Sequence, residues 1–352
     1  MGMCLSSSYE GKEESDENIV CRVEEGGLCC NNGEEKEEEE EEGIKSLVSL
    51  YSQQGKKGPN QDCAILYQGY GMEGVFCGVF DGHGRNGHMV SKLVRDYLPS
   101  ILINQRDALM LADNTGVLTD SDDDSSVDDE DYSSPSPAWF DEWKQACING
   151  FKAMDKELTF QPNLDCSYSG TTAVTIIKKG NDLIIANLGD SRAVLGTISD
   201  DGFLKAVQLT TDLKPDLPEE AERIRKKNGR VFALRDEPRN YRVWLPNDNF
   251  PGLAMARAFG DLQLKNYGII AVPQVSYHLL TSRDQFIVLA TDGVWDVLTN
   301  DQVVAIVWST SRKEEASKAV VDAAVRAWRR KYPASRADDC TAVCLFLQDL
   351  QI

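Results

Sequence analysis

The 352-residue sequence predicts an α+β fold in which antiparallel strands pack against amphipathic helices. Between residues 169 and 209, short β-prone runs follow one another across Lys-Gly-Asn and Asp-Gly turns, and no helix fits between them. Segments 139–158 and 314–330 instead have apolar residues at helical spacing. Together these patterns favour antiparallel sheets flanked by helices over an alternating βαβ array.

The remaining elements follow from the same two periodicities and from turn residues. Helices are predicted at 88–103, 139–158, 218–228, 300–309 and 314–330, and strands at 63–67, 75–80, 172–177, 183–187, 193–198, 203–209, 286–290 and 341–347. We interpret the four strands from 172 to 209 as one continuous meander, with Asp190 at a strand connection. Residues 235–252, rich in Pro, Asn and Asp, are predicted to form a loop, and Asn300 is predicted to cap its helix.

The strand at 75–80 ends abruptly in the polar sequence Asp81-Gly82-His83. The carboxylate offers an oxygen to a hard cation, the glycine lets the backbone approach closely, and the histidine can donate a proton. An ordinary Asp-Gly turn would explain the same residues. The strand at 286–290 repeats the design, because Asp292 and Gly293 follow it.

A glycine pattern between the first two strands matches a nucleotide-binding fingerprint only formally. Gly69, Gly71 and Gly74 have the dinucleotide spacing, but that motif must open a helix and here a β run follows. We therefore interpret these glycines as a hairpin turn.

The formal net charge of −20 is concentrated in two segments. Residues 1–43 contain 15 acidic and 3 basic side chains, and residues 113–138 contain 9 acidic side chains with no Lys or Arg. Like charges at this density resist collapse, so both are predicted to be disordered: a tail before a domain at 44–352, and an insertion within it. No basic stripe stands out, and nucleic acid binding is not expected.

The first residues, MGMCLS, fit the N-myristoylation pattern with Gly2 as acceptor and Ser6 at the hydroxyl position, although chance can also produce this pattern. One acyl chain binds membranes only marginally, and the acidic tail cannot supply a polybasic second signal, so Cys4 is the expected second acylation site. This predicts attachment to the cytoplasmic face of the plasma membrane; without the lipid, we expect cytoplasm or nucleus. Ten scattered cysteines without a C-x-x-C pair favour a reducing compartment.

Three predicted strand edges carry carboxylates: Asp81, Asp292, and either Asp338 or Asp339. A sheet can gather such edges at one rim, where the carboxylates repel one another unless cations neutralise them. Ligands that are all oxygen favour Mg²⁺ or Mn²⁺ over zinc, and two neighbouring ions can bind phosphate and activate a water.

On these residues the chain resembles a metal-dependent protein phosphatase of the PP2C type, in its plant form. The resemblance extends from about residue 44 to 347, and the order and spacing of eight motifs make it specific. The matching motifs are KKGPNQD, VFDGHGRNGH, SGTTAV, ANLGDSRAVL, LTTDLKPD, GLAMARAFGD, TDGVWDVL and RADDCTAV. The resemblance implies a four-layer αββα sandwich of two antiparallel sheets flanked by helices.

The resemblance also implies a metal-ligand set. Asp81 corresponds to the carboxylate that bridges two metals, and Gly82 would lend its carbonyl oxygen to the second. Asp292 and Asp338 would hold the first metal. Asp338 is preferred to Asp339 because the family pattern is Asp-Asn, and Asp339 falls on the Asn.

Other roles carry over in the same way. Asp62 would hold waters on the metals, and Asp190 resembles the ligand of a third, weaker metal. His83 matches the general acid, and Lys57 falls where many members have a phosphate-binding Arg. Lys57 is a point charge rather than a bidentate fork, and Gln61 replaces a common Glu, so weaker phosphate and metal binding are expected.

The implied function is hydrolysis of phosphoserine and phosphothreonine in protein substrates through a water activated by two Mg²⁺ or Mn²⁺ ions, by a monomer. A membrane-tethered pseudophosphatase that binds phosphoproteins without turnover is the alternative. The complete set of Asp81, Asp292 and Asp338 favours the enzyme. An acidic scaffold would explain the tail but not the eight ordered motifs.

Overall fold

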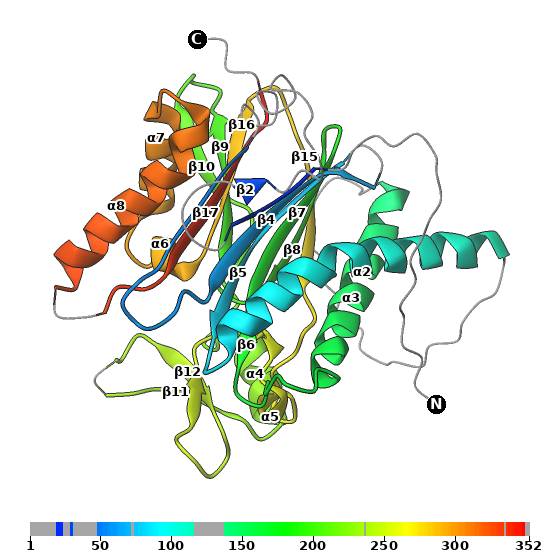
Figure 1. Cartoon of the computed structure of the whole chain (residues 1–352), viewed down its shortest axis with the longest axis vertical. Coiled ribbons are helices and arrows are strands. Elements are labelled where there is room, and N and C mark those ends of the chain that lie inside the picture. Colours follow the sequence, from blue (N-terminus) through cyan, green and yellow to red (C-terminus); the bar gives the residue numbers. More distant parts are fainter. Residues whose placement is uncertain are drawn as a thin grey trace.

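The computed structural model describes residues 19–23, 29–30, 48–71, 74–115, 137–235, 237–333 and 336–348. Two antiparallel sheets lie face to face between two pairs of helices (Figure 1). Helices α2 (Gly87–Thr115) and α3 (Ala138–Thr159) cover the larger sheet, and α7 (Asn300–Ser309) and α8 (Ala316–Lys331) cover the smaller one. The αββα expectation is confirmed.

The larger sheet has nine strands in the order β15-β8-β7-β5-β4-β1-β2; the short β6 pairs with β5, and β14 pairs with β6. Its strands are β1 (Ile19–Val23), β2 (Cys29–Cys30), β4 (Asp62–Tyr70), β5 (Gly74–His83), β6 (Gly170–Thr171), β7 (Ala173–Lys179), β8 (Asp182–Leu188), β14 (Phe259–Gly260) and β15 (Gln274–Leu279). The hairpin between β4 and β5 is the one that the glycine pattern predicted.

The smaller sheet has five strands in the order β10-β9-β16-β17-β3. They are β3 (Val48–Gln53), β9 (Arg192–Ile198), β10 (Leu204–Gln208), β16 (Asp284–Ala290) and β17 (Cys340–Phe346). A separate three-stranded sheet lies at one end of the sandwich (bottom of Figure 1), and short helices complete the fold. These elements are β11 (Arg230–Ala233), β12 (Tyr241–Trp244), β13 (Pro251–Leu253), α4 (Pro218–Lys226), α5 (Leu262–Lys265), α6 (Asp292–Trp295) and the 3₁₀ helix η1 (Lys313–Glu315).

Three apolar layers hold the sandwich together. Phe80 and Phe151 pack between the larger sheet and its helices, Leu289 packs between the two sheets, and Val304 and Val320 pack behind the smaller sheet. Each such buried side chain contributes about 1.5–3 kcal/mol. Because central strands are buried on both faces, their polar residues are left to the strand ends, where the site forms.

The predicted continuous meander is wrong at its midpoint. β7 pairs with β8, and β9 pairs with β10, but β8 belongs to the larger sheet and β9 to the smaller one. The chain crosses between the sheets at residues 189–191. Gly189 has a φ of +102°, and a Cβ there would lie 2.6 Å from Cγ2 of Thr172, so the crossing requires glycine. Asp190 is thereby placed between the two sheets.

Other boundaries also differ from the sequence expectations. The predicted loop at 235–252 contains β12 and β13, where Trp244 stacks on Phe232 with ring centroids 5.1 Å apart. The cap of α7 is Thr299 rather than Asn300: its hydroxyl accepts from the backbone N–H of Gln302, whose side chain accepts from the N–H of Thr299. This reciprocal pair satisfies two terminal donors.

The two predicted disordered segments were placed too broadly. Within residues 1–43, β1 pairs with β4, so that stretch belongs to the sheet. Helix α2 continues to Thr115, two residues past the expected start of the insertion. The rest of the acidic tail, including the acylation motif, and residues 116–136 lie outside the described residues.

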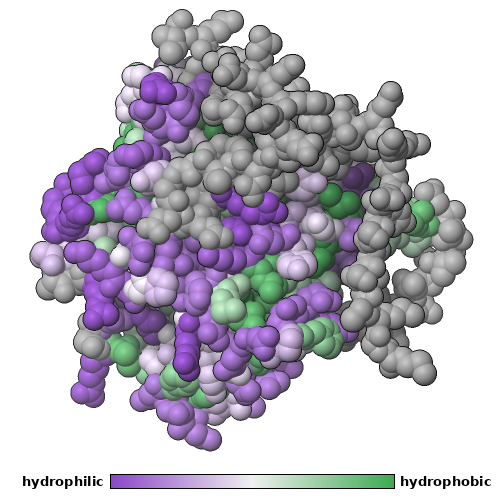
Figure 2. All heavy atoms as spheres, viewed as in Figure 1, coloured by the Kyte–Doolittle hydropathy of each residue, from purple (hydrophilic) through white to green (hydrophobic). Residues whose placement is uncertain are grey.

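The surface seen in Figure 2 is largely hydrophilic, with hydrophobic residues gathered in small areas. Within the described ranges, no helix combines the length and hydropathy that a bilayer crossing requires.

Candidate active site

The predicted carboxylates meet at one edge of the sandwich. Asp62 at the start of β4 faces Asp81 near the end of β5 in the antiparallel register. Asp292 follows β16, and Asp338 precedes β17 in the other sheet. Asp190 comes from the crossing between the sheets. The charges of these residues act on one another, since Asp62, Asp338 and Asp190 all act on Asp81.

Burial and mutual repulsion make these carboxyl groups hard to ionise together. Burial raises the pKa of Asp62, and the charge of Asp339 raises it further. Burial and then the charge of Asp62 raise the pKa of Asp81 well above its usual value. Burial and the charge of Asp81 do the same to the pKa of Asp292. The group needs protons or cations to balance it.

The donor set fits divalent cations. Asp190 is 2% exposed, and neither of its carboxyl oxygens has a hydrogen-bond partner, although Lys214 Nζ lies 3.4 Å from Oδ2. The charge of Asp81 raises the pKa of Asp292, so these two carboxyl groups lie within electrostatic reach of each other. No three His, Cys, Asp or Glu side chains in the described part of the chain form a preformed ligand set. A cation can nevertheless offset the repulsion between these carboxylates, and oxygen donors suit Mg²⁺ or Mn²⁺.

Only glycine fits at position 82. A Cβ there would lie 2.4 Å from the carbonyl oxygen of Gly87 and 2.6 Å from that of Gln61. The Gly82 N–H donates to the Gln61 carbonyl over 3.0 Å, which fixes this backbone between two strand ends. The close packing leaves the Gly82 backbone beside Asp81 with no side chain to obstruct an ion.

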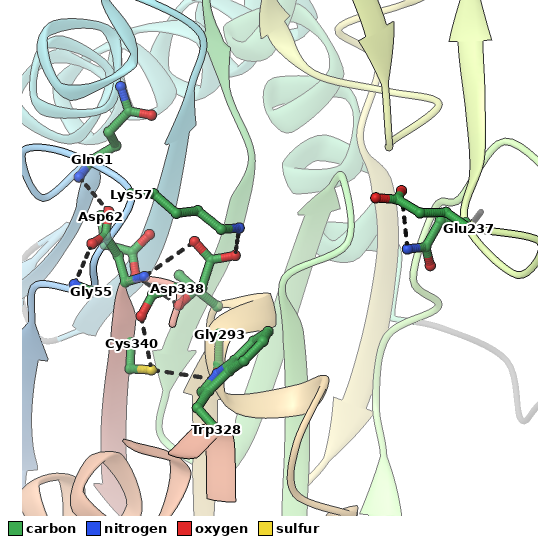
Figure 3. Close-up of polar contacts among 12 residues, drawn as sticks. Gly55, Lys57, Gln61, Asp62, Glu237, Gly293, Trp328, Asp338 and Cys340 are labelled. Carbon is green, nitrogen blue, oxygen red and sulfur yellow. Dashed lines mark hydrogen bonds and ion pairs between the residues drawn. The ribbon is translucent and has the colours of Figure 1, made fainter. Parts of the chain in front are cut away.

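The structure separates the roles of the two candidate aspartates; Figure 3 shows Asp338 beside Lys57. Both aspartates line the cavity, and Asp338 contacts the ammonium group of Lys57. Asp339 instead accepts hydrogen bonds from the backbone N–H groups of Gly55 at 2.6 Å and Gln61 at 2.9 Å. Asp339 therefore anchors the loop at 55–61, and Asp338 is the one available as a ligand.

Lys57 lies over this acidic rim. Burial alone would lower its pKa, but the charge and hydrogen bond of Asp338, with Asp292 and Asp81 behind, raise it, so Lys57 stays cationic. A cavity of about 220 Å³ opens beside it. The residues lining it are Lys57, Gly58, Pro59, Gln61, Asp81, Gly82, Gly84, Arg85, Asp338 and Asp339.

His83 is paired with a carboxylate that the sequence analysis did not assign to it. Its Nε2 lies 2.6 Å from Oδ2 of Asp261, which is 1% exposed, while Nδ1 has no hydrogen-bond partner. Burial would lower the pKa of His83, but the charge and hydrogen bond of Asp261 raise it overall. A Cβ on Gly170 would lie 2.8 Å from Nε2, so the pair depends on a glycine beside it.

Asp62 and Gln61 are held by strand-end hydroxyl and carbonyl groups. Asp62 Oδ2 accepts from the hydroxyl of Thr291 over 2.7 Å. The Gln61 amide donates to the carbonyl of Gly84 over 2.8 Å. A Glu carboxylate could not make that bond, so Gln61 secures the loop that follows His83.

The sequence analysis missed four residues of the site: Asp261, Asp296, Lys214 and Arg85. Asp296 caps α6, and its pKa is raised by burial and by the charge of Asp190 against the opposing charge of Lys214. It comes four residues after Asp292, one helical turn along the chain, and that spacing was a usable signal. Lys214, Asp261 and Arg85 lie within the quoted motifs LTTDLKPD, GLAMARAFGD and VFDGHGRNGH, but the motifs alone did not indicate that these side chains reach the site.

Comparison with known proteins agrees with this geometry. The family model described as Protein phosphatase 2C matches residues 48–331. The chain is 57% identical to "Probable protein phosphatase 2C 12" of Oryza sativa subsp. japonica, over 99% of this chain and 92% of the relative. It is 49% identical to "Probable protein phosphatase 2C 72" of Arabidopsis thaliana, over 99% and 98%.

A solved structure shares the architecture. A serine-threonine phosphatase 2C from Toxoplasma gondii superposes with a TM-score of 0.71 at 25% identity, covering 86% of this chain and 94% of that one. The fold, the gathered carboxylates and the family match agree. The chain therefore belongs to the protein phosphatase 2C family, in its plant form, and is a protein serine/threonine phosphatase.

Proposed function

We propose that the protein removes phosphate from phosphoserine and phosphothreonine in protein substrates with two Mg²⁺ or Mn²⁺ ions, acting as a monomer. Asp81, Asp292, Asp338 and the Gly82 carbonyl would hold the two ions, and Asp190 a weaker third. The observation that carries this proposal is that the carboxyl groups of Asp81 and Asp292, both with raised pKa values, lie together beside the cavity that Asp81 lines. When bound, the ions would neutralise phosphate and make a water nucleophilic near neutral pH.

The chain's own residues would position the substrate. Lys57 now contacts Asp338, and it would transfer that contact to the phosphate once cations occupy the carboxylates. Asp62, fixed by Thr291, would orient waters beside the ions. The second cavity-lining cation, Arg85, lies on the loop after His83 and is exposed to an incoming phosphoprotein.

His83 would supply the proton that the leaving Ser or Thr oxygen needs. Asp261 accepts at Nε2 and favours the imidazolium form. Nδ1 has no partner, so it is the ring atom free to carry the transferable proton.

The test is a phosphothreonine peptide assay on the full chain with added Mn²⁺, with and without chelator. Turnover should require the cation, and Mn²⁺ should also raise the melting temperature, because it neutralises the carboxylate repulsion. A phosphoprotein-binding adaptor would bind the peptide without turnover at any Mn²⁺ concentration, and that result would replace the enzyme proposal. Turnover that persists in chelator would contradict the metal mechanism.

We also propose that Gly2 and Cys4 carry acyl chains that hold the protein on the cytoplasmic face of the plasma membrane. The support is the sequence alone, because the motif lies outside the described residues. The acidic tail would repel an anionic leaflet, so a second acyl chain on Cys4, rather than basic residues, would have to strengthen the binding. Cell fractionation tests this proposal. Gly2→Ala should release the protein, and Cys4→Ser should leave weak, reversible association; firm binding of Gly2→Ala would contradict it.

A further inference from the structure

A second cavity borders the active site. It has a volume of about 240 Å³ and lies between the C-terminal part of α8 and residues 53–56. Asp338 lines both this cavity and the catalytic one. None of the proposed catalytic roles uses the side chains that α8 contributes here.

A thin wall of backbone separates the two cavities. The N–H of Lys56 donates to the Ala337 carbonyl over 2.8 Å, and a Cβ on Gly55 would lie only 2.4 Å from that same oxygen. The two lysines that follow Gly55 line different cavities. Lys56 lines the second cavity, called the α8 cavity below, and Lys57 lines the catalytic one. A chain bound across this wall would reach both cavities at once.

The floor of the α8 cavity is apolar and fixed. Trp328 is 8% exposed, and its indole N–H donates to the Gly293 carbonyl over 2.6 Å, as seen in Figure 3. The ring of Tyr332 lies 5.2 Å from the ring of Trp328 and is 46% exposed. Small-molecule pockets usually have roughly 300–1,000 Å³, so this smaller space suits a single aromatic or branched side chain.

The rim of the cavity is basic. Lys56 and Arg329 are both exposed, and Arg329 belongs to the run Arg329-Arg330-Lys331 in the last turn of α8. Asp338 is the one carboxylate among the described lining residues, and it faces Lys57. This rim therefore favours acidic residues next to the inserted side chain.

We propose that the α8 cavity is a substrate-recognition subsite. It receives an aromatic or branched apolar side chain, flanked by acidic residues, from the phosphoprotein segment whose phosphorylated residue occupies the active site. The two cavities are adjacent, since they share Asp338 and lie on either side of the backbone at 55–57, and this identifies the substrate itself as the occupant. The inference rests on the proposed function and extends it to a substrate class.

Phosphothreonine peptides test the subsite. In one set, Phe stands one to four residues from the phosphothreonine on either side, next to Glu; in the matched set, Ala replaces Phe. The best Phe peptide should exceed its Ala partner in kcat/KM by roughly 10-fold, the usual effect of filling an apolar pocket. Tyr332→Ala should remove most of that preference, and Arg329→Glu should weaken turnover of the Glu-containing peptides most at low salt.

Matched controls lie outside the cavity. Tyr97→Ala removes an exposed tyrosine from α2, and Arg326→Glu reverses an exposed charge on α8 that does not line the cavity. Both should retain the Phe preference. Hydrolysis of a small aryl phosphate is measured in parallel, because the inference predicts that the ratio of peptide to aryl phosphate kcat/KM falls in the two test variants only.

Calorimetric binding of the best Phe peptide separates the two proposals. If peptide binding is weakened by Tyr332→Ala but no substrate is turned over by the wild type, the subsite stands and the enzyme proposal fails. If the wild type turns over peptides with no Phe preference, or if both test variants lose aryl phosphate and peptide activity equally, the subsite is overturned while the proposed function stands.

Discussion

Buried carboxylates in this protein are stabilised at one place and left in mutual repulsion at another. Glu220 on α4 is 3% exposed, and two arginines surround it: Arg257 Nη2 lies 2.6 Å from Oε1, and Arg223 Nη1 lies 2.8 Å from Oε2. Burial alone would raise the pKa of Glu220, but these arginines hold it below its ordinary value. The arginines in turn donate to backbone carbonyls, including that of Val272.

Among the described residues, no arginine pairs with the carboxylates at the sandwich edge in this way. Asp81 faces Asp62 in the sheet register, and burial and the charge of Asp62 raise the pKa of Asp81. Glu220 thus forms a permanent ion pair with two arginines, whereas the edge carboxylates, of which Asp62 and Asp190 are buried and Asp81 and Asp292 are partly buried, form a site that would need cations. The presence or absence of arginines as planar, bidentate donors explains this difference. Removing one carboxylate charge should therefore destabilise the Glu220 region and stabilise the metal-free sandwich edge.

The largest effect is expected for Asp292→Asn. Phosphatase activity should fall at least ~10⁴-fold, because a proposed ion ligand is lost. This loss is smaller than the ~10⁶–10¹⁷-fold rate acceleration typical of enzymes. The metal-free protein should nevertheless melt at a higher temperature than wild type, since one repelling charge is gone. Calorimetric melting with and without Mn²⁺ and a phosphopeptide assay measure both; a lower metal-free melting temperature would contradict the comparison.

His83 and Asp261 form an intermediate case, a carboxylate with one titratable partner. His83→Ala should lower kcat by roughly 10²–10⁴-fold on phosphopeptides and less on an activated aryl phosphate, whose leaving group needs less protonation. Asp261→Asn should give a smaller loss with the same substrate dependence. Equal losses of the two substrates in His83→Ala would remove His83 from the role of acid.

Glu220→Gln should act on stability rather than chemistry. Leaving two partly buried arginines without the carboxylate that pairs with both should cost about 1–3 kcal/mol of unfolding free energy. Because the folded pKa of Glu220 is lowered, its contribution is fully present above the ordinary value of 4.5 and is lost as pH falls through the folded pKa. Denaturant unfolding of wild type and variant at pH 7 and at successively lower pH values should show the difference shrinking; a constant difference would contradict the assignment.

The smallest effect is expected at Lys57. Lys57 and Arg85 are the two cations among the described residues that line the catalytic cavity. Lys57→Ala should raise KM about 10-fold with little change in kcat, because phosphate charge is present in both ground and transition states. Lys57→Arg supplies a bidentate fork and should lower KM. A fall in kcat with unchanged KM for Lys57→Ala would assign Lys57 to the chemical step.

The sequence allowed prediction of most elements and of the central carboxylates, because both follow from local patterns. Apolar runs that end in Asp-Gly placed Asp81 and Asp292 at strand ends, and the structure brings them together. The sheet exchange at Asp190 could not be foreseen, since a turn within one sheet and a crossing between two have the same local residues. Asp261 was missed as the partner of His83 because only the tertiary fold brings residues 178 positions apart into contact.

The crossing of site residues between two sheets has a consequence for synthesis of the chain. Asp62 and Asp81 come from β4 and β5, which leave the ribosome early, whereas Asp338 directly precedes β17, one of the last elements made. A nascent chain can therefore complete most of the larger sheet before Asp338 is available to join Asp62 and Asp81 in the active site. A shift of one sheet against the other by a single residue, about 3.3 Å, would also separate the carboxylates that the two sheets contribute. The nascent protein is therefore expected to be inactive towards phosphoproteins until both sheets have docked. Cations that enter the finished site would then cross-link the two sheets.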